Sequence, residues 1–96
     1  MDTTKWLARV TEADSPAQVL ELVNRYIATR DPEVLATLPA ECRPAPMDNA
    51  GEVAACAYRL SAYHGHDDAN RVVQRLSAFF SYASLKLTEL ARERHE

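Results

Sequence analysis

The chain has 96 residues, a formal net charge of −3 and 47% hydrophobic residues, with two glycines and five prolines. This length and composition predict one folded domain, residues 1–96. The negative charge argues against nucleic acid or an anionic membrane as partner. Because neither a secretory leader nor an apolar run near the roughly 20 residues of a membrane span is present, we expect a soluble, cytoplasmic protein.

Two helices are predicted in the first third of the chain. The first covers residues 3–12, where three apolar residues share one stripe: Trp6, Leu7 and Val10. The second begins with Ser15 as N-cap, Pro16 at the first helical position and Gln18 completing a capping box. It is expected to end before Pro32, because a residue that precedes proline is pushed out of helical geometry. Its polar, outer face carries Glu21, Asn24 and Arg25.

A short third helix is predicted from Pro32, with Asp31 as its cap, and it is expected to end at Pro39. Its inward-facing residues are Val34, Leu35 and Leu38. Residues 39–47 then form the main loop of the chain. Since three of these nine residues are prolines, we expect the loop to be stiff and partly polyproline-like.

The fourth helix is predicted over residues 49–64, with Asn49 and Glu52 forming a second capping box and Gly65 ending it. Its apolar arc consists of Ala50, Val53, Cys56, Ala57, Leu60, Tyr63 and His64. The helix is rich in alanine. Because small side chains let neighbouring helices approach closely, we expect this helix to be central in the fold.

The last helix is the longest, predicted over residues 67–94, with apolar residues at 3-4-3-4-3 spacing: Val73, Leu76, Phe80, Ala83, Leu87 and Leu90. It would span about 40 Å. It is therefore either a spine along which shorter helices pack or a helix whose end projects. No strand pattern occurs. The predicted fold is all-α: a compact antiparallel helical bundle of four main helices, one short connecting helix and a long C-terminal helix.

The run His64-Gly65-His66-Asp67-Asp68 brings two imidazoles and two carboxylates together in five residues, as a metal site would. Helix ends explain the same residues without a metal. A histidine suits a helix C-terminus, glycine suits the turn after it, and aspartate caps the next helix. We favour this second interpretation and predict no metal and no cofactor.

Cys42 and Cys56 are the only cysteines, and they do not form a Cys-x-x-Cys pair. We expect one buried thiol, Cys56, and one loop thiol, Cys42. The alternative is a metal- or thiol-responsive regulatory protein that uses His64, His66, Asp67, Cys42 and Cys56.

No pattern indicates an enzyme. The serines of the last helix lack the glycine elbow of a nucleophile, and two glycines cannot form a phosphate loop. No pair of the 14 carboxylates stands out. Arginines and glutamates interleave along the last helix, as on a solvated face, so nucleic-acid binding is not predicted.

A candidate partner-binding stripe on the last helix consists of Arg71, Arg75, Ala78, Tyr82, Lys86, Glu89 and Glu93, with Leu85 beside it. Its 4-3-4-4-3-4 spacing is symmetric about Tyr82. In an antiparallel pair related by a two-fold axis, Arg71 would meet Glu93 of the second copy, and Tyr82 would meet its own counterpart. The simpler interpretation is a solvated face, since single exposed apolar residues are common.

The sequence thus leads to one main hypothesis of function. The protein is expected to be a small, non-enzymatic helical module for protein interaction or structure, with a protein or a second copy of itself as partner. Homodimerisation through the last helix is the specific form of that hypothesis.

Overall fold

A computed structural model describes residues 3–64 and 71–94 of the chain. Its elements, in chain order, are α1 (Thr3–Glu12), α2 (Pro16–Ala28), α3 (Pro32–Leu35), the 3₁₀ turn η1 (Ala40–Cys42), α4 (Ala50–His64) and α5 (Arg71–Arg94). Neither described range contains a strand. The predicted all-α bundle with a long C-terminal helix is therefore confirmed.

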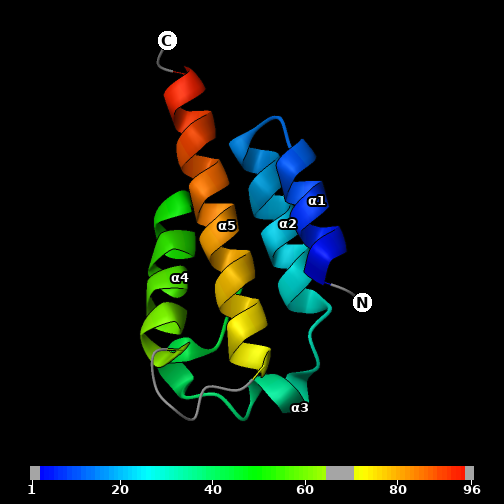
Figure 1. Ribbon diagram of the computed structural model, residues 1–96, viewed down its shortest axis with the longest axis vertical. Helices are drawn as coiled ribbons and strands as arrows, with labels where there is room; N and C mark the ends of the chain where they lie inside the picture. Colours follow the sequence, from blue (N-terminus) through cyan, green and yellow to red (C-terminus); the bar gives the residue numbers. More distant parts are fainter. Residues whose placement is uncertain (1–2, 65–70, 95–96) are drawn as a thin grey trace.

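Helix α5 is the centre of the fold. It lies between α4 on one side and α1 and α2 on the other, and it contacts all three (Figure 1). Its direction is opposite to that of α2 and α4 (Figure 1). The expectation that the alanine-rich α4 is central was wrong. The buried arc of α5 includes both Phe79 and Phe80, so it is wide enough to pack against helices on two sides. The main packing partners of α4 are only α5 and η1.

Four aromatic rings from three helices form the middle of the core. The rings of Tyr26 and Phe79 are stacked, with centroids 3.8 Å apart and an interplanar angle of 17°. Trp6 meets the edge of Tyr26 at 5.6 Å, and Phe80 meets Phe79 at 5.4 Å. All four side chains are buried. This cluster joins α1 and α2 to α5.

The capping residues predicted from the sequence begin α2 and α4. Ser15 Oγ accepts a hydrogen bond from Gln18 N at 3.3 Å, and Gln18 Oε1 accepts one from Asp14 N at 2.6 Å. At α4, Asn49 Oδ1 accepts from Glu52 N at 2.9 Å, and Asn49 Nδ2 donates to Glu52 Oε1 at 3.0 Å. Ser15 and Asn49 thus each satisfy one backbone N–H that has no partner within the helix. The second bond of the predicted capping boxes differs from expectation, because Gln18 bonds Asp14 N and Glu52 bonds the Asn49 side chain.

Helix α3 begins as predicted, with the Asp31 carboxylate accepting a hydrogen bond from Glu33 N at 2.9 Å. It ends at Leu35 rather than at Pro39. After Leu35 the backbone hydrogen bonds join residues three positions apart, as in a 3₁₀ turn. Leu38 N, for example, donates to Leu35 O at 3.1 Å. Leu38 is nevertheless buried, as expected.

The proline-rich loop is anchored to α2 by one side chain. Asn24 Nδ2 donates to Met47 O at 2.9 Å, and Met47 N donates to Asn24 Oδ1 at 2.8 Å. Met47 is buried. The expectation that Asn24 belongs to the outer, solvated face of α2 was therefore wrong, because the returning loop covers that side of the helix.

The last helix spans most of the 43 Å length of the molecule, and its final turns project beyond the other helices (Figure 1). It is therefore both a spine and a projecting helix, and Leu87 and Leu90 are still buried near that end. Residues 65–70, where its predicted start falls, lie outside the described residues. Among the helices described, none combines the length and the apolar character that crossing a bilayer requires.

Candidate functional site

The structure divides the predicted stripe of α5 into two parts. The Tyr82 hydroxyl hydrogen-bonds the Thr11 hydroxyl, and Lys86 Nζ donates to Thr11 O at 3.1 Å. Both side chains are half-buried against α1, so the expectation that the whole stripe faces away from the core was wrong at these two positions. The exposed members are Arg71, Arg75, Ala78, Leu85, Glu89 and Glu93. A two-fold contact centred on Tyr82 stays a prediction.

Both thiols are buried. Cys42 is the expected loop thiol, in η1, but it is only 4% exposed and its Sγ lies 3.8 Å from Arg59 O, so the loop thiol is buried as well. Cys56 is 3% exposed, and both cysteines are free. Burial raises the pKa of Cys42, and the nearby Glu41 carboxylate adds to the rise. Burial raises the pKa of Cys56 to about 11. The raised pKa values disfavour the thiolate form of both groups at neutral pH, and the thiolate is the form that oxidants attack.

These pKa shifts predict slow thiol chemistry and a pH-dependent stability. At pH 8 a thiol reagent should modify the cysteines of the folded protein slowly. In denaturant, the same reagent should modify both cysteines rapidly. For Cys56 the raised pKa stabilises the folded state fully below about pH 9, and this contribution is lost as the pH rises toward 11. The free energy of unfolding should therefore fall over that range.

A Cys56→Ala variant is the control for the pH dependence, because it removes the titrating thiol and other groups also ionise above pH 9. Its free energy of unfolding should fall less steeply with pH than that of the parent. Immediate modification of either cysteine in the folded protein would show that its thiol is accessible and would contradict the prediction.

The predicted metal-like run falls mostly outside the described residues. His66, Asp67 and Asp68 lie in the segment 65–70, and His64 is described only as the last residue of α4. Within residues 3–64 and 71–94, no three His, Cys, Asp or Glu side chains are grouped as a metal site would require. The choice between metal ligands and helix caps stays a prediction for this run.

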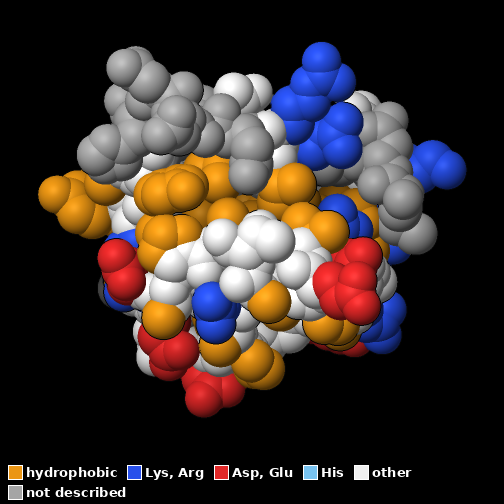
Figure 2. Space-filling model, turned by 90° about the horizontal axis from the view of Figure 1, so that it is seen from below, with side chains coloured by type: hydrophobic (Ala, Val, Ile, Leu, Met, Phe, Trp, Pro, Cys, Tyr) orange, Lys and Arg blue, Asp and Glu red, His pale blue; other side chains and the backbone are white. Residues whose placement is uncertain are grey.

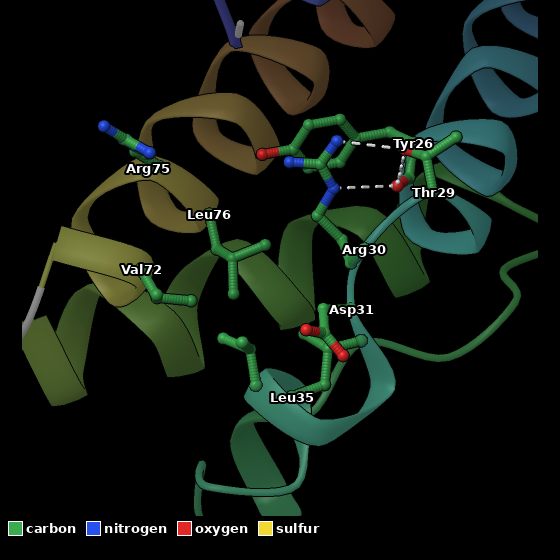
Figure 3. A pocket seen from close by; sticks show the side chains of 9 residues that line it. Tyr26, Thr29, Arg30, Asp31, Leu35, Val72, Arg75 and Leu76 are labelled. Atoms are coloured by element: carbon green, nitrogen blue, oxygen red, sulfur yellow. Dashed lines mark hydrogen bonds between the residues drawn. The ribbon is translucent and has the colours of Figure 1, made fainter. Parts of the chain in front are cut away.

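A cavity of about 210 Å³ lies where the C-terminal end of α2, helix α3 and the first turns of α5 meet (Figure 3). One part of its lining is apolar and consists of Val34, Leu35, Val72 and Leu76. The other part is polar and consists of Tyr26, Thr29, Arg30, Asp31 and Arg75. Figure 2 shows the molecule from the end at which α3 lies, with hydrophobic side chains gathered across it and Lys and Arg side chains beside them.

Arg30 is held in place on the wall of this cavity. Its Cζ atom lies 4.1 Å from the centroid of the Tyr26 ring, a cation–π contact. Nε donates to Tyr26 O at 3.2 Å, and Nη2 donates to Thr29 Oγ1 at 3.0 Å. The end of α2 therefore fixes a positive charge beside the apolar lining, with the Nη1 group left without a hydrogen-bond partner among the described residues.

The outer face of α4 is a second surface with unusual composition. Tyr58 is 78% exposed, the most exposed large hydrophobic residue among those described. The exposed residues that share its side of the helix are small and uncharged: Gly51, Ala54, Ala55 and Ala62. Ser61 marks the edge of this face, because its hydroxyl hydrogen-bonds the Ser77 hydroxyl of α5 at 3.2 Å. The main packing partners of α4 among the described elements are α5 and η1.

Comparison of the chain with protein-family models, with curated proteins and with solved structures finds no match. Any function must therefore be argued from the described surfaces and the cavity. Sequence reasoning did not find either the cavity or the outer face of α4. The signal for the second was present in the spacing of residues 51, 55, 58 and 62, which lie one helical turn apart and carry no charge.

Proposed function

We propose that the protein is a non-enzymatic helical interaction module that associates with a second copy of itself through the outer face of α4. The observation that carries this proposal is the exposure of Tyr58 among small, uncharged neighbours. An exposed aromatic side chain is a typical anchor of a protein interface. The two free cysteines suit a cytoplasmic setting, which is part of the proposal.

The face is complementary to itself in an antiparallel pair. Its positions 51, 55, 58 and 62 follow 4-3-4 spacing, which is symmetric about a point between Ala55 and Tyr58. A two-fold axis at that point places Tyr58 opposite Ala55 of the second copy, and Gly51 opposite Ala62. Large side chains thus meet small ones in both directions, as a symmetric contact requires.

Charge also favours this face over the rest of the surface. The chain has a net charge of −3, so two copies repel each other in general. The stripe of Gly51, Ala55, Tyr58 and Ala62 contains no charged residue, so contact there buries no unpaired ion. On α5, by contrast, Tyr82 is half-buried and its hydroxyl is hydrogen-bonded to Thr11, so less of its ring is free for a symmetric contact.

Sedimentation velocity tests the proposal. The parent should sediment as a dimer at about 100 μM, and Tyr58→Glu should sediment as a monomer, because two carboxylates would be forced into an apolar contact. The matched control is Leu85→Glu, which places the same charge at a 55% exposed leucine of α5 and should leave the dimer intact.

Each alternative result has a defined meaning. A parent that is monomeric at this concentration would overturn self-association through α4. A dimer that dissociates on Leu85→Glu but tolerates Tyr58→Glu would move the contact to α5, where the sequence alone placed it.

A further inference from the structure

We propose that the cavity between α2, α3 and α5 is a binding site for a small monocarboxylate with an apolar body. This site shares no residue with the outer face of α4. The proposal therefore does not depend on self-association, and either one can fail while the other holds.

The charges on the wall favour an anion. Two arginines and one aspartate line the cavity, which gives a formal charge of 2 − 1 = +1. Arg30 is held by its stacking on Tyr26 and by two hydrogen bonds, and Arg75 is exposed and forms no ion pair among the described residues. The Asp31 carboxylate already accepts the backbone N–H of Glu33 as the cap of α3.

Arg30 is therefore the pre-organised cation of the site. Ordering a free arginine side chain on binding costs conformational entropy, and at Arg30 the fold of α2 has already ordered it. A guanidinium group binds carboxylates well because it offers several N–H donors in one plane. Arg75 of α5 also lines the cavity and is a second, less constrained cation; its guanidinium points away from Arg30, on the far side of Leu76 (Figure 3).

The apolar lining decides what kind of anion fits. Val34 and Leu35 of α3 face the cavity together with Val72 and Leu76 of α5. A bare inorganic anion would leave this surface in contact with water, whereas a carboxylate with a hydrocarbon ring would cover it. The volume of about 210 Å³ exceeds that of the roughly 150 Å³ cavity that accepts benzene in another protein. One ring with a carboxylate is therefore the right size.

Benzoate is a suitable probe, titrated into the 96-residue chain and followed by calorimetry and by amide chemical shifts. The expected dissociation constant is about 1 mM or lower, given the size of the ligand. Shifts should be largest at the end of α2 and in α3. Benzyl alcohol, which has the ring without the charge, should bind at least about tenfold more weakly. Inorganic phosphate, which has charge without the ring, should compete poorly.

Three variants, each of which replaces one arginine with glutamine, show where benzoate binds. Arg30→Gln should weaken benzoate binding about tenfold, and Arg75→Gln about threefold. Arg92→Gln is the control, because Arg92 is exposed near the far end of α5 and lines no part of this cavity. Circular dichroism confirms that each variant is folded. If Arg30→Gln does not fold, Arg75→Gln and the benzyl alcohol comparison still decide.

The proposal is overturned if benzoate causes no saturable heat or shift up to about 10 mM. It is also overturned if benzyl alcohol binds as tightly as benzoate, if phosphate displaces benzoate completely, or if Arg92→Gln weakens binding as much as Arg75→Gln. Binding that needs both the ring and the charge, and that is sensitive to the cavity arginines alone, supports it.

Discussion

Replacing Phe79 with alanine is expected to lower the free energy of unfolding by about 3–5 kcal/mol. The Phe79 ring is completely buried, is stacked on Tyr26 and meets the edge of Phe80, so its removal leaves a cavity where three helices join. A domain of this size has a total stability near the low end of about 5–15 kcal/mol. The variant should therefore be partly unfolded at 37 °C, and urea denaturation followed by circular dichroism measures the loss.

Tyr26→Phe is the informative control for that experiment. The Tyr26 hydroxyl is buried and has no hydrogen-bond partner among the described residues. Removing it keeps the stacked ring and relieves the desolvation of an unpaired polar group, so stability should stay unchanged or rise by up to about 1 kcal/mol. If Phe79→Ala costs less than about 1 kcal/mol, or if Tyr26→Phe is the more damaging change, this aromatic cluster is not the centre of the core.

The helix boundaries could be predicted because they depend on local chemistry. Ser15, Asp31 and Asn49 each precede a helix and accept a hydrogen bond from a backbone N–H two or three residues later. Such a contact involves only neighbouring residues, so the sequence contains all the information it needs. The position of α1, α2 and α4 followed from these caps and from the spacing of apolar residues.

The partner of each helix face could not be predicted in the same way. Tyr82 was assigned to an exposed face because it lies opposite the main apolar stripe of α5. In the structure, α1 packs over that side, and the amphipathic tyrosine ring is half-buried while its hydroxyl reaches Thr11. Nothing in the spacing of α5 alone indicates that α1 covers this side of the helix.

The burial of Cys42 was missed for a related reason. Its proline-rich surroundings correctly indicate a loop, and loops usually lie at the surface. This loop returns across α2 and places η1 against α4, which buries the thiol beside Arg59. The cavity that we propose as a carboxylate site is likewise formed by the ends of three elements, and it exists only when all three are placed.

Asn24 joins the proline-rich loop to α2, and the second large effect on stability is expected at this residue. Asn24→Ala should lower the free energy of unfolding by about 2 kcal/mol. The change removes both hydrogen bonds to Met47 and leaves the N–H and C=O of that buried residue without their partners. Urea denaturation measures the loss. Glu21→Ala, which removes only an exposed ion pair with Arg25 on the same helix, should change stability by less than about 0.5 kcal/mol.

Limited proteolysis of Asn24→Ala distinguishes release of the loop from a general loss of stability. Because Asn24 contacts the chain 23 residues away, its removal should release residues 39–47 before the helices unfold. Limited proteolysis should then cut this segment faster in Asn24→Ala than in the parent, at a temperature where both keep their full helical signal. The released loop would also uncover Cys42, so a thiol reagent should modify this cysteine faster. An unchanged loop together with lowered global stability would mean that Asn24 supports α2 itself and does not anchor the loop.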